Sequence, residues 1–317
     1  MTARPPVQIV WFKRDLRVDD HEPLAQATAQ TAVKGPVLPL YVIEFDLWQQ
    51  PDSSGRQYEF LSDCLAELRE ACASLGQPLI IRVGNMIEVL ADLQDNFTIT
   101  ALWSHQETGN RWTFDRDIRV GDWCVEHGIP WHQPRQHGID RGRVQRNGWA
   151  KRWDAMMAKP TWKRPQTLTP IAGLDPGPLP CWADVSHAGD PCPYRQQGGR
   201  NAALSTLDSF LHGRGEPYQK AMSSPVTAFD ACSRLSPHLA YGTLSMREAA
   251  QAAWARQDAV RALPPGQRGK WPGAMNSFVG RLHWHCHFMQ KLESDPKLEF
   301  ENMHPAYDGL REGEFTE

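Results

Sequence analysis

The sequence predicts a parallel α/β domain followed by an all-helical domain. Short apolar runs alternate with amphipathic helical patterns up to about residue 128. This alternation is typical of a parallel sheet with helices on both faces. A stretch rich in Pro and Gly follows, at 160–199. Beyond it the pattern is helical with turns, and no strand signal returns.

The first apolar runs have the composition of strands buried on both faces, because they are short and bounded by Gly, Pro or charged turns. The predicted strands cover residues 7–12, 37–43, 78–83 and 99–103. The segments between them carry apolar residues three and four apart, as Phe60, Cys64 and Leu68 do. The predicted helices cover residues 21–30, 54–75, 86–93 and 112–127. The domain is Rossmann-like, but it lacks the GxGxxG motif of dinucleotide-binding domains.

These patterns divide the chain into three parts. We expect an α/β domain at 1–132, an interdomain linker at 133–199 and the first part of a helical domain at 200–317. The linker is long enough that it must cross a surface. It begins with basic residues, from Arg141 to Arg152, which form either a solvated face or contacts to nucleic-acid phosphates.

Composition narrows the class of protein. The 317 residues carry a formal net charge of −3 with a pI near 6.5, so any binding to nucleic acid depends on a local basic patch. The seven cysteines form no CxxC pair, which favours reduced thiols in the cytoplasm. The sequence predicts neither a signal peptide nor a membrane span. We expect a cytoplasmic monomer with no membrane contact.

Two helix starts lie close together within 218–247. Ser236 stands before a proline, as an N-cap residue does, and Gly242 ends that short helix. Ser245, with Glu248 three residues later, predicts a capping box.

The first of these starts has two readings. Ser233, Arg234 and Ser236 supply two hydroxyls and a guanidinium beside the N–H groups of a helix start. Such donors suit a phosphate or a pyrophosphate. The alternative is that the serines are only caps and that Arg234 is an ordinary surface residue.

The last clear helical pattern, at 276–293, contains two candidate features. One is an aromatic residue and the other is a pair of histidines. Arg281 and Trp284 share a face, and a lone Trp on such a helix is by default core filler. His283 and His287 also share a face, but no third ligand is evident, so we expect no metal.

A polar loop at 104–112 follows the fourth predicted strand. Parallel α/β sheets hold ligands at the carboxyl ends of their strands. The loop is therefore either a ligand contact or a polar loop that caps the next helix.

Three stretches resemble the DNA photolyase and cryptochrome family. The segment SRLSPHL at 233–239, with Gly242, is similar to the family's flavin-binding signature. The segment VWFKRDLRVDD at 10–20 is similar to its opening strand and turn. The segment RLHWHCHF at 281–288 resembles the helix in which a Trp lies beside the flavin pocket.

The resemblance implies an all-α FAD-binding domain and assigns roles to its residues. The residues expected to hold the FAD phosphates and ribityl chain are Cys232, Ser233, Arg234, Leu235 and Ser236. Tyr218 would contact the flavin, and Trp284 would be the catalytic platform on which the damaged base stacks. Arg281 and His285 would contact DNA where many members have Glu and Arg, and Cys232 replaces the usual Thr. Glu107 would contact an antenna chromophore, a folate or a deazaflavin.

The resemblance also implies an activity. The expected reaction is that of a deoxyribodipyrimidine photo-lyase, the light-driven repair of cyclobutane pyrimidine dimers in UV-damaged DNA by an electron from reduced FAD. One alternative is a cryptochrome-type blue-light photoreceptor without repair activity. Another is a non-catalytic module that binds a nucleotide-like ligand without flavin. Family chains continue past the point where this one stops, so we expect an incomplete flavin domain that binds FAD weakly or not at all and is inactive alone.

Overall fold

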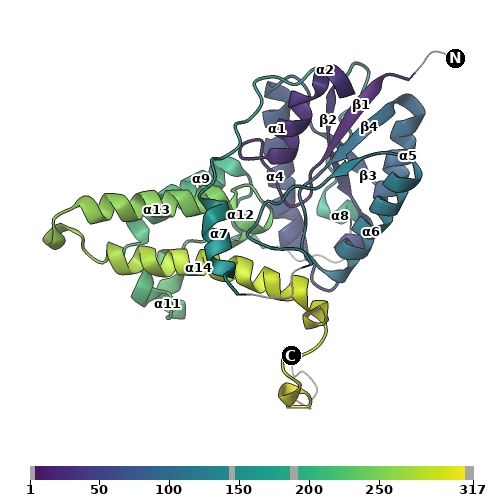
Figure 1. Cartoon of the computed structure of the whole chain (residues 1–317). Coiled ribbons are helices and arrows are strands. Elements are labelled where there is room, and N and C mark those ends of the chain that lie inside the picture. The colour runs from purple at the N-terminus through teal and green to yellow at the C-terminus, as the bar shows by residue number, and fades with distance from the viewer. Residues whose placement is uncertain (1–3, 143–146, 186–191, 311–317) are drawn as a thin grey trace.

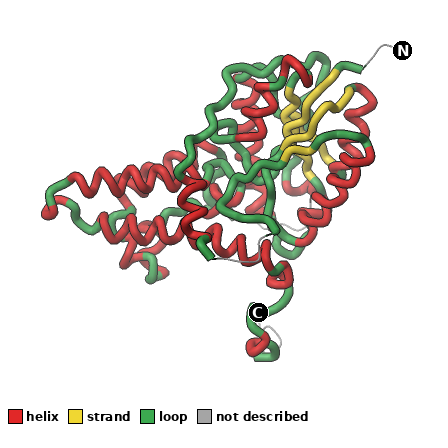
Figure 2. Tube along the Cα trace, viewed as in Figure 1, coloured by secondary structure: helices red, strands yellow, loops and turns green. Residues whose placement is uncertain are grey.

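The computed structural model describes residues 4–142, 147–185 and 192–310, and a single parallel sheet lies at the centre of its first half (Figure 1, Figure 2). The strands are β1 (Pro6–Trp11), β2 (Val37–Ile43), β3 (Ile80–Val83), β4 (Thr98–Trp103) and β5 (Trp131–His132). Their order is β3-β2-β1-β4-β5, and every neighbouring pair is parallel. The strand order reverses at β1, so the carboxyl ends of β1 and β4 form the topological switch point, where such sheets bind ligands.

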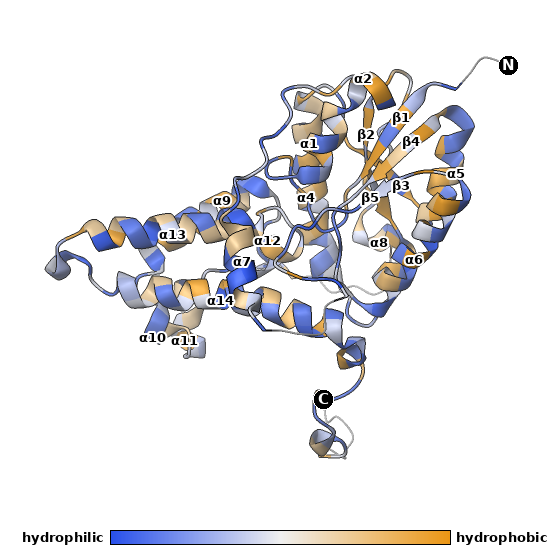
Figure 3. Cartoon of the chain, viewed as in Figure 1, coloured by the Kyte–Doolittle hydropathy of each residue, from blue (hydrophilic) through white to orange (hydrophobic). Residues whose placement is uncertain are grey.

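Helices cover both faces of this sheet, which confirms the predicted fold class. They are α1 (Glu22–Ala29), α2 (Thr31–Lys34), α3 (Phe45–Trp48), α4 (Gly55–Ser74), α5 (Met86–Asn96) and α6 (Arg111–Glu126). One face packs on α1 and α4, through side chains such as Leu24 and Leu65. The other face packs on α5 and α6, through Leu90 and Val120. In Figure 3, orange hydrophobic residues gather on the central strands and on parts of the helices around them.

The interdomain linker at 133–199, called the connector below, crosses α4 and the outer strand of the sheet. It contains the helices α7 (Trp149–Met157) and α8 (Trp182–Val185). The backbone N–H of Ile81 in β3 donates to the Pro176 carbonyl at 2.8 Å. The Tyr58 hydroxyl of α4 donates to the Pro180 carbonyl at 2.9 Å. The connector therefore covers an edge strand that would otherwise expose unpaired backbone groups.

The second half of the chain is helical. Its α-helices are α9 (Arg200–Ser209), α10 (Tyr218–Ala221), α11 (Pro225–Ala231), α12 (Ser236–Ala240), α13 (Met246–Ala262) and α14 (Trp271–Ser294). Its shorter turns are η1 (Phe210–Arg214), η2 (Pro265–Gln267), η3 (Pro296–Glu299) and η4 (Pro305–Tyr307). The long helices α13 and α14 extend away from the sheet, and Phe210, Met246 and Phe278 lie in the core that they share with the shorter helices (Figure 1). Among the described residues, no helix is both long and apolar enough to span a bilayer.

The two predicted helix starts have different outcomes. Ser245 and Glu248 form the capping box, since the Ser245 hydroxyl accepts from the Glu248 N–H at 3.0 Å and the Glu248 carboxylate accepts from the Ser245 N–H at 2.9 Å. Ser236 is not an N-cap. It is the first residue of α12, Leu235 occupies the cap position, and no side chain caps this helix. The proline then stands second in the helix, where its missing N–H is equally harmless.

Gly242 ends α12, as predicted, and it also joins the two halves. It has a φ of 68°, and a Cβ at this position would collide with the backbone of Arg14 and Asp15 in the turn after β1. The Arg17 guanidinium donates to the Gly242 carbonyl at 2.8 Å. The N–H of Leu16 donates to the Tyr241 carbonyl at 3.0 Å. The first turn of the α/β half is therefore in direct contact with the start of α13.

Candidate functional site

The predicted flavin-binding residues lie together on the loop that enters α12. Arg214 of η1 fixes this loop, because its guanidinium donates to the carbonyls of Cys232 and Ser233, the latter at 2.6 Å. The Gln196 side chain donates to the Arg234 carbonyl at 2.8 Å. Arg234 has a φ of 61°, a left-handed conformation that is uncommon outside glycine. The loop therefore has a specific shape imposed by bonds to its carbonyl groups.

The side chains of this loop are not equally available to a ligand. Leu235 is only 1% exposed and belongs to the helical core, so only its backbone could contact a cofactor. Cys232, Ser233 and Arg234 are half-buried, and Ser236 is exposed. The hydroxyls and the guanidinium retain the donor chemistry that a diphosphate requires, and the thiol at Cys232 is a weak donor.

Tyr218, Arg281 and Trp284 form a second group. Tyr218 is buried and packs edge-on against Phe210, with the ring centroids 5.3 Å apart. Burial raises the pKa of the Tyr218 phenol, Cys232 adds to this rise, and the nearby Arg281 guanidinium opposes it. Arg281 lies 4.3 Å over the ring of Trp284, which is 52% exposed. The exposure excludes the reading of Trp284 as core filler.

His285 does not lie with Arg281 and Trp284, so the three predicted DNA contacts do not form one surface. Successive helical residues are about 100° apart around the axis, and His285 points instead to the connector, where its ring lies 5.8 Å from that of His137. Burial lowers the pKa of His285 to about 4. His285 therefore faces the connector, and its contact with DNA stays a prediction.

His283 and His287 share a face, as predicted, and both contact the ring of Trp149, at 6.4 and 5.8 Å. The Nε2 atom of His283 lies 2.9 Å from the Asp154 carboxylate, and its Nδ1 atom lies 3.0 Å from the Val279 carbonyl. Both ring nitrogens of His283 are thus already engaged. The pair packs an aromatic contact and does not form a metal site with the residues around it.

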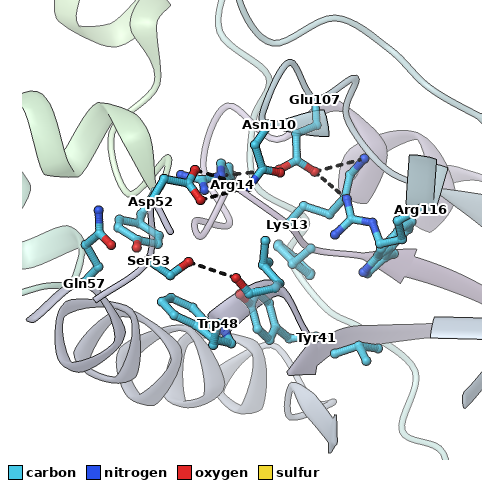
Figure 4. A pocket seen from close by; sticks show the side chains of 15 residues that line it. Lys13, Arg14, Tyr41, Trp48, Asp52, Ser53, Gln57, Glu107, Asn110 and Arg116 are labelled. Carbon is cyan, nitrogen blue, oxygen red and sulfur yellow. Dashed lines mark hydrogen bonds and ion pairs between the residues drawn. The ribbon is translucent and has the colours of Figure 1, made fainter. Parts of the chain in front are cut away.

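Glu107 belongs to a buried group of charged side chains at the switch point (Figure 4). We call this group, which consists of Lys13, Glu107, Arg116 and Asp117, the edge cluster. The Glu107 carboxylate lies 2.7 Å from Arg116, 3.6 Å from Lys13 and 3.4 Å from Arg14. Arg116 and Lys13 also bind Asp117, at 2.9 and 2.8 Å. Burial alone would raise the pKa of Glu107, but Arg116 and Lys13 outweigh it, and the pKa lies below its usual value. Glu107 is therefore a carboxylate held by the protein's own cations.

A cavity of about 50 Å³ lies beside the edge cluster, lined by Asp52, Ser53, Asn110 and Tyr41 among others (Figure 4). This volume holds only a few water molecules. Asn110 donates to the Asp52 carboxylate at 3.2 Å across it. A folate or a deazaflavin at this place would require these side chains to move, and the antenna contact of Glu107 stays a prediction.

Sequence reasoning missed a buried group of Asp15, His21 and His105. The Asp15 carboxylate lies 2.9 Å from His21 Nε2 and 2.7 Å from His105 Nδ1. Burial lowers the pKa of His105 to about 3, although Asp15 acts in the opposite direction. A usable signal existed, because Asp15 and His105 directly follow β1 and β4, two neighbouring strands whose carboxyl ends meet.

The ligand atoms of this group lie within 4.8 Å of one another, close enough to surround a metal ion. The hydrogen bonds favour another interpretation. His21 Nδ1 accepts from the Leu24 N–H at 3.1 Å, so its proton is on Nε2, where it is donated to Asp15. Metal binding through Nε2 would move that proton to Nδ1 and break the cap of α1. We interpret the group as a hydrogen-bond network that fixes the turn after β1.

Two described residues of the basic run, Arg141 and Arg152, make contacts within the protein. Arg152 binds the Asp140 carboxylate at 2.7 Å, and Arg141 donates to the Glu107 carbonyl. Arg143 and Arg146, which belong to the same run, lie outside the described residues. The proposal that this run contacts DNA phosphates gains no support from Arg141 and Arg152.

Comparison with known proteins supports the resemblance along most of the chain. A family model described as DNA photolyase matches residues 8–148. A deoxyribodipyrimidine photo-lyase of Halobacterium salinarum is 29% identical and covers 95% of the chain, which spans 64% of that protein. A cryptochrome DASH of Gloeobacter violaceus is 26% identical and covers 75% of the chain, which spans 51% of that protein.

Solved structures show the same architecture. A bacterial class III photolyase from Agrobacterium tumefaciens has a TM-score of 0.76 at 21% identity and covers 98% of the chain. An archaeal photolyase from Sulfolobus tokodaii, solved with two FAD molecules, has a TM-score of 0.70 at 21% identity and covers 96% of the chain. The chain spans 63% of the first of these structures and 64% of the second. The switch-point sheet, the helical half and these similarities agree: residues 8–148 match the DNA photolyase family model, and the chain is similar to photolyases and cryptochromes along most of its length.

Proposed function

We propose that this protein is a flavin-dependent photolyase that repairs cyclobutane pyrimidine dimers in UV-damaged DNA. The observation that carries the proposal is the half-exposed Trp284, with the Arg281 guanidinium 4.3 Å from its ring and the Tyr218 phenol close by. An exposed indole offers a flat surface on which a flipped base can stack. The adjacent guanidinium offers positive charge to a DNA phosphate.

The residues of the α12 loop fit FAD by their chemistry. Ser233, Ser236 and Arg234 would hold the diphosphate, and Cys232 would give a weaker contact than a hydroxyl. Tyr218 would border the flavin ring. Bound and reduced, FAD would supply the light-excited electron that opens the cyclobutane ring of the dimer. The name of the Sulfolobus tokodaii structure, which mentions two FAD molecules, supports this cofactor and is compatible with a second chromophore.

The protein's own residues would position the substrate. A damaged pair is weakly stacked in the duplex, so extruding it costs less than extruding an intact pair. Trp284 would then replace the lost base stacking, and Arg281 would neutralise the neighbouring phosphate. We further propose that the protein acts as a monomer in the cytoplasm, and that Glu107 borders an antenna chromophore of the folate or deazaflavin class.

The test starts with the 317-residue chain purified and mixed with FAD. Bound flavin is measured by absorbance after gel filtration. Repair is measured with an oligonucleotide that contains one thymine dimer, under blue light and with a reductant present. Because the chain spans 64% of the photo-lyase of Halobacterium salinarum, the proposal requires only weak flavin binding at saturating FAD, with a light-dependent return of two thymines above the dark control. The variant Trp284→Ala should bind flavin equally and lose at least about tenfold in repair, because stacking contributes roughly 1–3 kcal/mol per base. Equal repair by the variant and the unaltered chain would contradict the role of Trp284.

A second candidate is a blue-light photoreceptor without repair activity. It is favoured by the similarity to cryptochrome DASH and by the distance of His285 from the Trp284 face. The same preparation separates the candidates. Light-dependent reduction of bound flavin, together with unrepaired dimers in single- and double-stranded oligonucleotides, would support the photoreceptor.

A further inference from the structure

A groove at the junction of the two halves plays no part in the proposed flavin chemistry. It has a volume of about 860 Å³ and lies between the start of α1, the connector around α7 and the start of α13. We propose that this groove binds a nucleoside phosphate. Its charged and aromatic lining residues are Glu22, Arg135, Arg152, Lys159, Trp162 and Arg247. Its volume lies within the range of ordinary small-molecule sites.

The charges around the groove favour an anion. Arg135 and Arg152 share one carboxylate, that of Asp140, at 2.9 and 2.7 Å. A single carboxylate between two guanidiniums leaves positive charge at the groove wall. Arg247 is paired with Asp20 at 2.8 Å. These distances describe a site with a small excess of positive charge, which suits one or two phosphate groups.

Trp162 offers the surface for a base. Its side chain is 39% exposed and lines the groove. Its backbone is fixed on both sides, because its N–H donates to the Asp20 carboxylate at 3.0 Å and its carbonyl accepts from the Asp20 N–H at 2.9 Å. The indole lies near the Glu22 carboxylate, and its effect lowers the pKa of Glu22 against the larger, opposite effect of burial. An indole held in this way can stack on a planar base with little loss of side-chain entropy.

The segment that carries these groups is fixed before any ligand binds. The Gln251 side chain of α13 donates to the carbonyls of Met157 and Lys159, at 2.8 and 2.7 Å. Arg247 donates to the Pro160 carbonyl at 3.1 Å. Preorganisation of this kind reduces the entropic cost of binding. Gln133 also lines the groove.

A mononucleotide fits this groove better than a nucleic acid does. A nucleic acid needs several cations placed along its backbone. Here Arg247 is paired, and Arg135 and Arg152 share a carboxylate. The lining also comes from three separate segments that converge on one aromatic side chain. The arrangement supplies one stacking surface and one region of positive charge, which are the two parts that a nucleoside phosphate requires.

The experiment is isothermal titration of the unaltered chain, without flavin, with AMP and with ADP. We expect saturable binding of both. Lys159→Glu should weaken binding about tenfold, since it reverses a charge at the phosphate end. Trp162→Leu should weaken it about fivefold or more, through the loss of stacking. Lys163→Glu is the matched control, because Lys163 is exposed and is not part of the groove wall. It should bind as the unaltered chain does.

Other results would overturn the proposal. No saturable binding of AMP or ADP at millimolar concentration would do so. Equal affinity in Lys159→Glu, Trp162→Leu and the control would place the nucleotide elsewhere. Binding of a single-stranded oligonucleotide, with neither AMP nor ADP bound, would identify a nucleic-acid surface instead. Ser233→Ala separates this site from the proposed flavin site, because it should leave AMP affinity unchanged even if flavin binding fails.

Discussion

The two halves of the molecule differ in how far the side chains of their candidate sites are exposed to solvent. In the edge cluster, four charged side chains are nearly inaccessible to solvent. Each forms an ion pair with another within 3.6 Å, and the four are Lys13, Arg116, Glu107 and Asp117. On α14, Trp284 and Phe288 are both more than half exposed. The first region uses charge to build structure. The second region leaves aromatic surface available, which is the condition for binding a partner. The comparison supports the proposal that Trp284 of the helical half takes part in recognition.

Removal of Arg116 should have the largest effect on this contrast. Arg116→Met leaves the buried carboxylates of Glu44, Glu107 and Asp117 with too few cations. Breaking a buried ion pair from one side costs roughly 3–5 kcal/mol, because the remaining charges stay desolvated. We expect a loss of that size in the free energy of unfolding, measured by urea denaturation. Arg119→Met, at an exposed position of the same helix, should change stability by less than about 0.5 kcal/mol. Similar stability of the two variants would mean that the edge cluster contributes little.

The pH dependence of stability should have an intermediate effect. Burial lowers the pKa of His105 to about 3, whereas an unfolded histidine titrates near 6.5. Below pH 6.5 the unfolded chain therefore binds a proton that the folded chain does not, so stability falls as the pH falls towards 3. One such histidine corresponds to about 1–2 kcal/mol between pH 6.5 and 5.

The variant His105→Gln tests this dependence. Its unfolding free energy, measured across pH 5 to 7, should fall less steeply than that of the unaltered chain. His212→Gln, at an exposed histidine, is the control and should retain the original slope. A slope unchanged by both substitutions would show that His105 is already charged in the folded state.

The smallest effect on stability is expected at Trp284. Because this side chain is 52% exposed, Trp284→Ala should lower the free energy of unfolding by less than about 1 kcal/mol. Trp153→Ala is the matched comparison, since Trp153 is 1% exposed and the loss of a buried Trp costs roughly 3–5 kcal/mol. Differential scanning calorimetry of both variants measures this difference. A large loss at Trp284 would place it in the core and weaken its proposed role.

The regular strands and helices of the α/β half were predicted well, because their signal lies in neighbouring residues. The second predicted strand matches β2 at both ends, and the helix expected at 54–75 differs from α4 by one residue at each end. Buried strands and amphipathic helices carry their pattern in neighbouring residues. By contrast, α7 lies between polar segments, and β5 has only two residues. Neither is long enough to give a clear periodic signal.

The candidate site was predictable in its residues but not in its geometry. Helical spacing placed Arg281 and Trp284 on one face, and the structure agrees. No local pattern could show that His285 faces His137, because that contact joins segments far apart in the chain. Likewise, Asp20 binds both Trp162 and Arg247, and these three residues approach one another only after the two halves have docked.

The close contact at Gly242 has a consequence for the evolution and engineering of this chain. A side chain here would collide with the turn after β1. The segment that resembles a flavin signature therefore also forms part of the contact between the two halves. Separating the two halves would remove the turn against which Gly242 packs. The two lobes should therefore be expressed, swapped or redesigned only as a matched pair.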